Sequence, residues 1–402
     1  MRLEKLSIAD VPIEGKRLFV RVDFNVPLDT QGHVTDDTRI RASLPTIQHA
    51  TARGAKVILA SHLGRPAGKV DPRYSLRPVA ACLSGLLGQN IPLADDCVGP
   101  TVEDLVARMR ERDVLLLENL RFHPEEEQND LRFAQQLAQL VDVYVNDAFG
   151  TAHRAHASTE GITQYLSIAV AGLLMQAELI HLGQLLATPE RPYVAILGGA
   201  KVSDKIDLIF NLLPKLNRVL IGGGMAYTFL VAEGMPVGNS LVEADKVEAA
   251  RDILTRATAL RVAIQLPEDH VIAERLDANA ATRIVPKDGI PSRWMGVDIG
   301  PQTVAAFTRA IHEAKTVVWN GPMGVFEIAP FAKGTNAVAR AVVSSKATTI
   351  VGGGDSVAAI NQAGVADRIT HISTGGGAFL ELLEGRELPG VAALLDKPMT
   401  GS

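Results

Sequence analysis

The stretch Val351-Gly352-Gly353-Gly354-Asp355-Ser356 lies between a predicted strand and a predicted helix. Residues 347–351 form the short β-branched run that is typical of a buried strand. Residues 356–360 begin a helical pattern that ends at Gly364. Glycines and an acid at a helix start can surround an anion with backbone N–H groups and place a carboxylate beside it. For this stretch alone, a glycine turn with Asp355 as the helix cap is the simpler interpretation.

The length and composition indicate a two-domain globular protein. At 402 residues the chain exceeds what one hydrophobic core usually supports. Its hydrophobic content of 47% and charged content of 21% are ordinary for a globular protein. A net charge of −5 without a long basic run argues against a nucleic-acid-binding protein. The two cysteines, Cys82 and Cys97, are too few for a disulfide framework, which favours a reducing compartment.

No part of the sequence predicts export or a membrane span. The first residues lack the apolar segment of a signal peptide. The most apolar long window, 166–187, is interrupted by Gln176, Glu178 and His181, which a bilayer would bury at high cost. We therefore expect a soluble cytoplasmic protein in which this window is a buried helix.

The first half of the chain alternates strands with helices. A strand is predicted over 18–26, with Arg21, Asp23 and Asn25 on its polar face. The other predicted strands are 56–60, 114–117 and 141–145, and the predicted helices are 39–53, 76–87, 102–112 and 131–140. This order predicts an α/β fold with a mostly parallel sheet between two layers of helices.

Cationic side chains follow the ends of these predicted strands, where ligands of such sheets bind. They are Arg39 and Arg41 at the start of the first helix, His62, Arg65 and Lys69, Arg121 and His123, and His153, Arg154 and His156. Any single arginine is better explained by a surface salt bridge. Their shared location favours a site for a small polyanion, because guanidinium groups pair with phosphate or carboxylate through two hydrogen bonds. A metal held by His153 and His156 is not expected, since Asp147 is the one other ligand type nearby.

The second half repeats the alternation, and glycine loops follow its predicted strands. These loops begin at Gly198, Gly222, Gly321, Gly352 and Gly375. Turn chemistry alone does not require so many glycines, and close approach of backbone to a ligand is a common reason for them. Lys201 and Lys205 would point to the same side if a helix began near Lys201.

Two common nucleotide-binding motifs are missing. No G-x-x-x-x-G-K-[ST] motif occurs, which excludes a P-loop enzyme. No glycine loop completes G-x-G-x-x-G, which disfavours a dinucleotide-binding domain.

Nine motifs resemble those of the phosphoglycerate kinase family, in the family's order and over nearly the whole chain. They are RVDFNVP at 21–27, SHLGRP at 61–66, LENLRF at 117–122, GTAHRAH at 150–156, LGGAKVSDK at 197–205, GGGMAYTF at 222–229, VWNGPMGVFE at 318–327, VGGGDS at 351–356 and STGGGA at 373–378. The resemblance implies reversible transfer of a phosphoryl group from 1,3-bisphosphoglycerate to ADP, giving 3-phosphoglycerate and ATP with Mg²⁺. This is a step of glycolysis.

The resemblance also implies the site residues. The phosphoglycerate would bind to Asp23, Asn25, Arg39, His62, Arg65, Arg121 and Arg154. The nucleotide would bind to Lys201, Lys205, Gly296, Asn320, Glu327, Gly353, Gly354, Asp355 and Ser356. Arg39, Lys201, Gly375 and Gly376 would be catalytic, and Asp355 would hold the Mg²⁺. Phe379 and Gln302 depart from the family's pattern, which leaves the packing around the adenine open.

The family further implies two Rossmann-like, three-layer lobes joined by a hinge helix. We expect a phosphoglycerate-binding domain over 1–170, a hinge over 171–187 and a nucleotide-binding domain over 188–387, with the tail 388–402 returning to the first domain. Closure of the hinge would bring the substrates together for in-line transfer. The family also suggests a monomer.

The chemistry of the reaction agrees with a site rich in cations and poor in bases. Phosphoryl transfer needs alignment and charge neutralisation, and an acceptor carboxylate is already ionised at neutral pH. Asp23 and Asn25 would orient the glycerate hydroxyl, while Arg65, Arg121 and Arg154 would hold its remote phosphate. Arg39, Lys201 and the amides at 375–377 would neutralise the transferring group, and Glu327 would bind a ribose hydroxyl.

Two other functions fit part of the sequence. A nicotinamide-dependent dehydrogenase would require the complete glycine fingerprint that is missing. A hinged two-domain anion-binding protein would explain the arginines but not Lys201, Asp355 and Glu327 in the other half.

Overall fold

The computed structural model describes residues 1–398 and divides into two compact units. Unit 1 contains Met1–Gly183 together with the chain from Glu387 onward, and unit 2 is Gln184–Arg386. Helix α6, Leu173–Ala187, carries the chain from the first unit to the second. Residues 399–402 of the predicted tail lie outside the described part of the chain.

Unit 1 is built on a five-stranded parallel sheet with the order β3-β2-β1-β4-β5. Its strands are β1 Arg17–Arg21, β2 Lys56–Ala60, β3 Val114–Leu116, β4 Val143–Asn146 and β5 Ala169–Ala171. Its other α-helices are α1 Thr38–Ala52, α2 Arg77–Leu87, α3 Pro100–Ala107, α4 Pro124–Glu127, α5 Leu131–Gln139 and α14 Pro389–Ala392. Its 3₁₀ helices are η1 Ile8–Asp10, η2 Pro72–Tyr74, η3 Leu120–Phe122, η4 Phe149–Thr151 and η5 Gly161–Tyr165.

The two faces of this sheet are both buried. On one face, Leu18 and Val20 of β1 share a core with Ile47 of α1 and Leu83 of α2. On the other face, Phe19 stacks on Tyr144 of β4, with ring centroids 6.0 Å apart. A parallel sheet that is covered on both faces shows hydrophobic runs rather than alternation, as these strands do.

The burial of both faces corrects the strand predicted over 18–26. The strand β1 ends at Arg21, and Arg21 is fully buried rather than on an outward polar face. Val22, Phe24 and Val26 do enter the core, but as an extended segment beyond the strand. Alternation is a signal for half-exposed strands, so it placed Arg21 wrongly in a doubly covered sheet.

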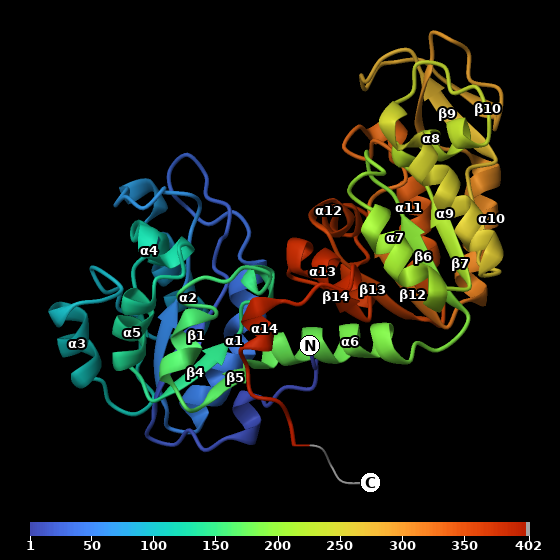
Figure 1. Cartoon of the computed structure of the whole chain (residues 1–402). Coiled ribbons are helices and arrows are strands. Elements are labelled where there is room, and N and C mark those ends of the chain that lie inside the picture. The colour runs from blue at the N-terminus through green and yellow to red at the C-terminus, as the bar shows by residue number, and fades with distance from the viewer. Residues whose placement is uncertain (399–402) are drawn as a thin grey trace. The chain divides into compact units, whose positions relative to one another are not determined.

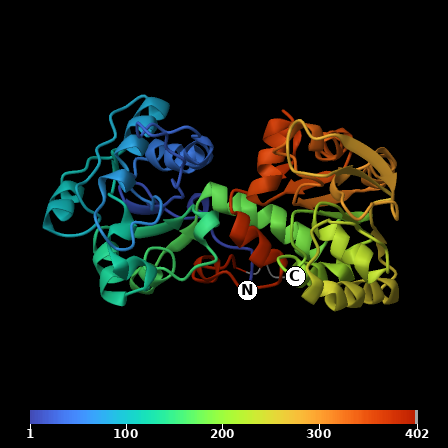
Figure 2. The ribbon, with the colours of Figure 1, turned by 90° about the horizontal axis from the view of Figure 1, so that it is seen from above.

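The start and the end of the described chain meet in unit 1. Leu6 donates a backbone hydrogen bond to the carbonyl of Leu395, and Lys5 Nζ lies 2.7 Å from Asp396 Oδ1. The first residues and the segment that follows α14 lie side by side in both views (Figures 1 and 2).

Unit 2 is built on a six-stranded parallel sheet with the order β14-β13-β12-β6-β7-β8 (Figure 1). Its strands are β6 Tyr193–Leu197, β7 Arg218–Ile221, β8 Ala263–Gln265, β12 Thr316–Asn320, β13 Thr348–Val351 and β14 His371–Ile372. Its helices are α7 Ile206–Leu212, α8 Met225–Ala232, α9 Val247–Ala259, α10 Pro301–Glu313, α11 Lys333–Ser344, α12 Gly354–Gln362 and α13 Gly376–Leu383. Its 3₁₀ helices are η6 Leu213–Lys215, η7 Ala244–Lys246, η8 Ala329–Phe331 and η9 Ala366–Arg368.

A small antiparallel sheet adds to unit 2 and was not predicted. It has the order β10-β9-β11, with β9 Asp269–Ala273, β10 Thr282–Pro286 and β11 Met295–Ile299. The edge strand β10 is largely exposed, so it lacks the apolar run by which the buried strands were found.

Two further features bear on the predictions. Helix α7 begins at Ile206 and not near Lys201, so Lys201 lies in the preceding loop and the two lysines do not share a helix face. Among residues 1–398, no helix is both long and apolar enough to cross a membrane.

Candidate active site

In unit 1, Asp23, Asn25 and Arg39 are joined directly at the carboxyl end of the sheet. Arg39 Nη1 lies 3.0 Å from Asp23 Oδ2 and donates to the Asn25 carbonyl at 3.3 Å. The Asn25 backbone N–H donates to Asp23 Oδ1. Arg39 extends from the first turn of α1, and its side chain is 40% exposed while that of Asp23 is 12% exposed. The guanidinium is thus anchored on one side and open to a ligand on the other.

A second chain of hydrogen bonds links Asn25 to Arg121. Asn25 Oδ1 accepts from the Gly64 backbone N–H at 2.8 Å, and the Gly64 carbonyl accepts from Arg121 Nη1 at 2.9 Å. Glu127 lies 3.3 Å from Arg121 Nε, but this nitrogen is not aligned for a hydrogen bond. Burial lowers the pKa of Arg121, with the charges of Arg21 and Arg154 acting in the same direction. The charges of Glu127 and Glu126 oppose this shift, so the cations are only partly balanced by neighbouring carboxylates and can pair with an anionic ligand.

His62 lies in the middle of this cationic set. It is 4% exposed, and burial holds its pKa well below the usual value, followed by the charges of Arg21, Arg121 and Arg39. Arg21 Nη2 lies 3.4 Å from His62 Nδ1. A neutral imidazole can accept from Arg21 at Nδ1 and present an Nε2–H donor to a ligand.

A buried network beneath His62 was missed by the sequence analysis. Arg21 Nε donates to Ser158 Oγ at 2.8 Å, and Ser158 Oγ donates to Glu126 Oε1 at 2.6 Å. Burial raises the pKa of Glu126, and the charge of Arg21 opposes that rise. His156 lies 3.9 Å from the same carboxylate, and burial lowers its pKa to about 3. Arg21 is part of the RVDFNVP motif, but it lies in a strand, and the sequence analysis looked for cationic side chains in the loops after the strands.

The two remaining arginines are less tightly held. Arg154 is half-buried, donates from Nε to His153 Nε2 at 3.2 Å and lowers the pKa of Arg121 through its charge. Arg65 is exposed and follows Gly64 in the chain, without a hydrogen bond to another described residue. The structure therefore connects six of the seven predicted residues by hydrogen bonds, ion pairs or the effect of one charge on another's pKa. Arg65 lies next to them only because it follows Gly64 in the chain.

In unit 2, Lys205, Asn320 and the Gly352 loop are linked in one chain. Lys205 Nζ donates to Asn320 Oδ1, and Asn320 Nδ2 donates to the Gly352 carbonyl at 2.6 Å. The fully buried Ser356 accepts from the Gly321 N–H at 2.6 Å. Burial lowers the pKa of Lys205, while the charges of Asp204, Glu384 and Asp355 raise it.

The glycine loops approach one another so closely that a residue with a side chain would not fit at several positions. A Cβ on Gly198 would lie 2.1 Å from the carbonyl oxygen of Pro322, and one on Gly321 would lie 2.2 Å from that of Gly198. For these residues, contact between loops is a sufficient reason for glycine, and no ligand is needed to explain them. Gly354 differs, because a Cβ there would have no heavy atom within 4 Å.

Two helices begin beside each other in this region. Gly354 begins α12 and Gly376 begins α13, and a Cβ on Gly376 would lie 3.7 Å from Gly353 Cα. Gly353 has a φ of 95°, which favours glycine, and it takes the N-cap position in place of the expected Asp355. Two helix N-termini at one place present unpaired N–H groups to an anion.

Asp355 fits a Mg²⁺ ion that is bound mainly through nucleotide phosphates. It lies exposed in the first turn of α12, and its carboxylate accepts no hydrogen bond from residues 1–398. Mg²⁺ commonly takes one or two carboxylates and fills its other positions with phosphates and water.

Three predicted nucleotide residues are not tied into this chain of contacts. Lys201 and Glu327 are exposed. Gly296 lies in β11, where a Cβ would meet the Tyr227 hydroxyl at 1.8 Å, so packing alone accounts for this glycine. Phe379 packs against Gly352, at the foot of the loop.

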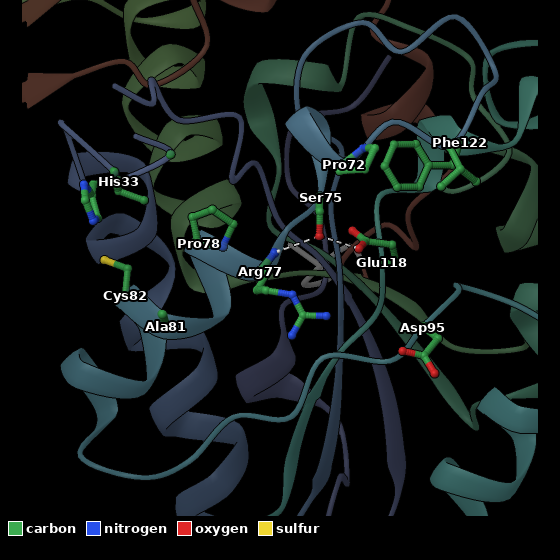
Figure 3. Close-up of a pocket in the computed structure, with 13 residues that line it drawn as sticks. His33, Pro72, Ser75, Arg77, Pro78, Ala81, Cys82, Asp95, Glu118 and Phe122 are labelled. Atoms are coloured by element: carbon green, nitrogen blue, oxygen red, sulfur yellow. Dashed lines mark hydrogen bonds between the residues drawn. The ribbon is translucent and has the colours of Figure 1, made fainter. Parts of the chain in front are cut away.

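A pocket of about 710 Å³ in unit 1 lies outside the predicted site (Figure 3). Its walls include His33, Pro78, Cys82 and Phe122, and none of its lining residues belongs to the predicted set. In Figure 3, Ser75 bridges the Arg77 backbone N–H and the Glu118 carboxylate at the pocket wall. We do not assign this pocket to the reaction.

Comparison with known proteins gives one consistent result. The family model described as Phosphoglycerate kinase matches residues 8–386. The phosphoglycerate kinase of Pelotomaculum thermopropionicum is 56% identical over 395 residues, covering 98% of this chain and 100% of the relative. That of Moorella thermoacetica is 58% identical over 395 residues, with the same coverage.

Solved structures agree with the sequence relatives. The structure of phosphoglycerate kinase from Coxiella burnetii matches with a TM-score of 0.90 at 41% identity, over 97% of this chain and 98% of that one. The structure from Pyrococcus horikoshii matches with a TM-score of 0.84 at 33% identity, with the same coverage.

Proposed function

This chain belongs to the phosphoglycerate kinase family, and from this premise we propose how its two units divide the work of the reaction. The enzyme transfers a phosphoryl group reversibly from 1,3-bisphosphoglycerate to ADP, giving 3-phosphoglycerate and ATP. In the reverse direction a carboxylate is the acceptor.

Unit 1 binds the phosphoglycerate in this proposal. Asp23 and Asn25 orient the glycerate hydroxyl, with His62 as a further donor. The remote phosphate pairs with Arg65, Arg121 and Arg154. The observation that carries the assignment is the linked set of cations around buried His62, whose pKa is lowered by burial and by the charges of three arginines. Such a set costs free energy unless a polyanion completes it.

Unit 2 binds the nucleotide. The starts of α12 and α13 offer backbone N–H groups to the phosphates, and Lys205, held by Asn320, supplies charge beside them. Lys201, Gly296 and Glu327 complete the nucleotide site. Asp355 would hold the Mg²⁺, which when bound neutralises phosphate charge.

No residue needs to act as a general base. The acceptor carboxylate is already ionised, and Asp23 is engaged by Arg39 at 3.0 Å. Arg39, Lys201 and the amides of Gly375 and Gly376 then stabilise the charge that spreads over the transferring group. This accounts for catalysis by alignment and neutralisation alone.

The two half-sites belong to different units, so the substrates must be brought together during each turnover. We assign this movement to the segments near 166–192 and 388–389, with water excluded on closure. We further propose that the protein acts as a cytoplasmic monomer. Small-angle scattering that stayed unchanged when both substrates were added would argue against the closure.

A coupled assay that follows ATP formation from 1,3-bisphosphoglycerate and ADP tests the function. We expect turnover that depends on both substrates and on Mg²⁺. A protein that bound either substrate without turnover would contradict the proposal.

A further inference from the structure

Three side chains with metal-binding groups meet in unit 1, and none of them belongs to the proposed active site. They are Asp96, Cys97 and His123, and their carboxylate, thiol and imidazole donor atoms all lie within 4.8 Å of one another. Asp96 Oδ1 lies 2.7 Å from His123 Nε2. We propose that these three side chains form a binding site for Zn²⁺.

The backbone places the donors independently of any metal. Asp96 and Cys97 lie in the loop between α2 and α3, and the Asp96 carbonyl accepts from the Glu118 backbone N–H at 3.3 Å. His123 is the N-cap residue of α4, and its ring stacks on Phe133 with centroids 5.1 Å apart. The ligands are thus held before the ion arrives, which limits the ordering that binding must impose.

The charge around the thiol favours a divalent cation. Cys97 is fully buried, and Asp96 and Glu126 place negative charge near its thiol. Asp96 and Glu125 also place negative charge near His123. When Zn²⁺ replaces the thiol proton, one thiolate and one carboxylate balance its two charges, and the metal with its ligands carries no net charge.

The ligand types select the metal. Thiolate and imidazole suit Zn²⁺, whereas Mg²⁺ and Ca²⁺ prefer oxygen ligands. Three protein ligands leave a fourth tetrahedral position for water, since His123 and Asp96 are partly exposed.

Binding would also act on the phosphoglycerate site. His123 follows Arg121 by two residues in the segment of η3 and α4, and Arg121 donates to the Gly64 carbonyl. A metal that joins His123 to the loop of Asp96 and Cys97 therefore restrains the segment that carries Arg121. The simpler alternative is an Asp96–His123 ion pair beside an inert buried cysteine.

Cobalt titration distinguishes the proposed zinc site from an ion pair beside an inert cysteine. Untagged, full-length protein is stripped with a chelator, kept reduced without thiol reagents and free of nucleotide, and titrated with Co²⁺. We expect a thiolate-to-cobalt absorption band that saturates at one equivalent and disappears when Zn²⁺ is added. No band, or a band that Zn²⁺ leaves unchanged, would overturn the proposal.

Variants identify the ligands. Cys97→Ser and His123→Gln should each abolish the band, whereas Cys82→Ser, the matched control at the other cysteine, should keep it. His123→Gln changes a partly exposed side chain and decides the question if Cys97→Ser does not fold. Zn²⁺ at about a hundred times its Kd should raise the melting temperature of the wild type and of Cys82→Ser, but not of the other two variants. A band or a thermal shift that survives in both Cys97→Ser and His123→Gln would refute the site.

Discussion

The two units offer their ligands different kinds of surface. Unit 1 presents charged side chains that rest on a buried network of Arg21, Ser158 and Glu126. Unit 2 presents mainly backbone, with glycine loops packed against one another and two helix starts side by side. In the proposed assignment, unit 1 binds the phosphoglycerate, which is small and offers few atoms beyond its charges, so side chains must reach it. Unit 2 is proposed to bind the nucleotide, whose longer phosphate chain can accept hydrogen bonds from successive backbone N–H groups.

This difference determines how each half can be damaged. A lost charge at Arg39 or Arg65 should cripple unit 1 while its fold persists, because these two side chains are partly or fully exposed. An added methyl group at Gly198 or Gly321 should damage unit 2, because the loops have no room for a Cβ at these positions.

The largest effect is expected from Arg39→Ala. Removal of a cation that acts in the transition state typically lowers kcat on the order of 10³-fold, with a smaller change in substrate affinity. Steady-state kinetics with both substrates measures this. Arg41→Ala is the control, since Arg41 lies two residues along α1 and pairs with Asp37 on the surface. Normal turnover of the Arg39 variant would remove this residue from catalysis.

In unit 2, Gly198→Ala should destabilise the fold while Gly354→Ala should not. The added methyl at Gly198 would lie 2.1 Å from a backbone oxygen, and overpacking of this kind costs about 3 kcal/mol. At Gly354 the space is open, so the free energy of unfolding should change by less than about 0.5 kcal/mol. The KM for ADP should rise, because the added methyl group would lie at the start of α12, where the nucleotide phosphates are proposed to bind. Denaturant unfolding and kinetics test the pair. Equal stability of the two variants would contradict the account of the loops.

Each unit also contains one buried aspartate with a raised pKa. Burial raises the pKa of Asp147 and that of Asp298 to about 7 each. Asp147 accepts from the Leu174 and Met175 N–H groups at the start of α6. In the unfolded chain such a group titrates near pH 4, so the folded protein holds the proton longer and loses stability as pH rises from about 4 to 7.

Replacement of these carboxylates by amides should make the stability depend less on pH. We expect Asp147→Asn and Asp298→Asn each to raise the stability at pH 8 relative to the wild type, on the order of 2 kcal/mol, and to have less effect at pH 4. Melting temperatures across this range provide the measurement. A wild type whose stability rises steadily from pH 4 to 7, with no gain in either variant, would show that these groups are ionised throughout.

The smallest effect is expected from Arg65→Ala. Arg65 is exposed and makes no hydrogen bond within residues 1–398, so its removal should leave stability unchanged. Loss of one charge-assisted contact should raise the KM for 3-phosphoglycerate about tenfold with kcat little altered. An unchanged KM at low and high salt would exclude Arg65 from the site.

The sequence was sufficient where signals were local. The parallel sheets, the loops after their strands and the positions of Asp23, Arg39 and Asn320 follow from hydrophobic runs and motif order. It failed for Arg21, because a charged residue in a strand was assumed to face outward, and for Lys201, because the glycine loop runs on to Ile206 before a helix forms. The reason for the glycines also required coordinates, since the contact between Gly198 and Pro322 joins segments far apart in the chain.

The most direct test of the division between the units is calorimetry with each substrate alone. 3-Phosphoglycerate and Mg²⁺–ADP are titrated separately into the wild type, Arg65→Ala and Gly354→Ala. The account predicts a crossed result, in which Arg65→Ala weakens only the binding of 3-phosphoglycerate and Gly354→Ala weakens only the binding of Mg²⁺–ADP. The assignment of one substrate to each unit would be wrong if either variant weakened the binding of both ligands equally. It would also be wrong if Arg65→Ala weakened only the binding of Mg²⁺–ADP and Gly354→Ala only that of 3-phosphoglycerate.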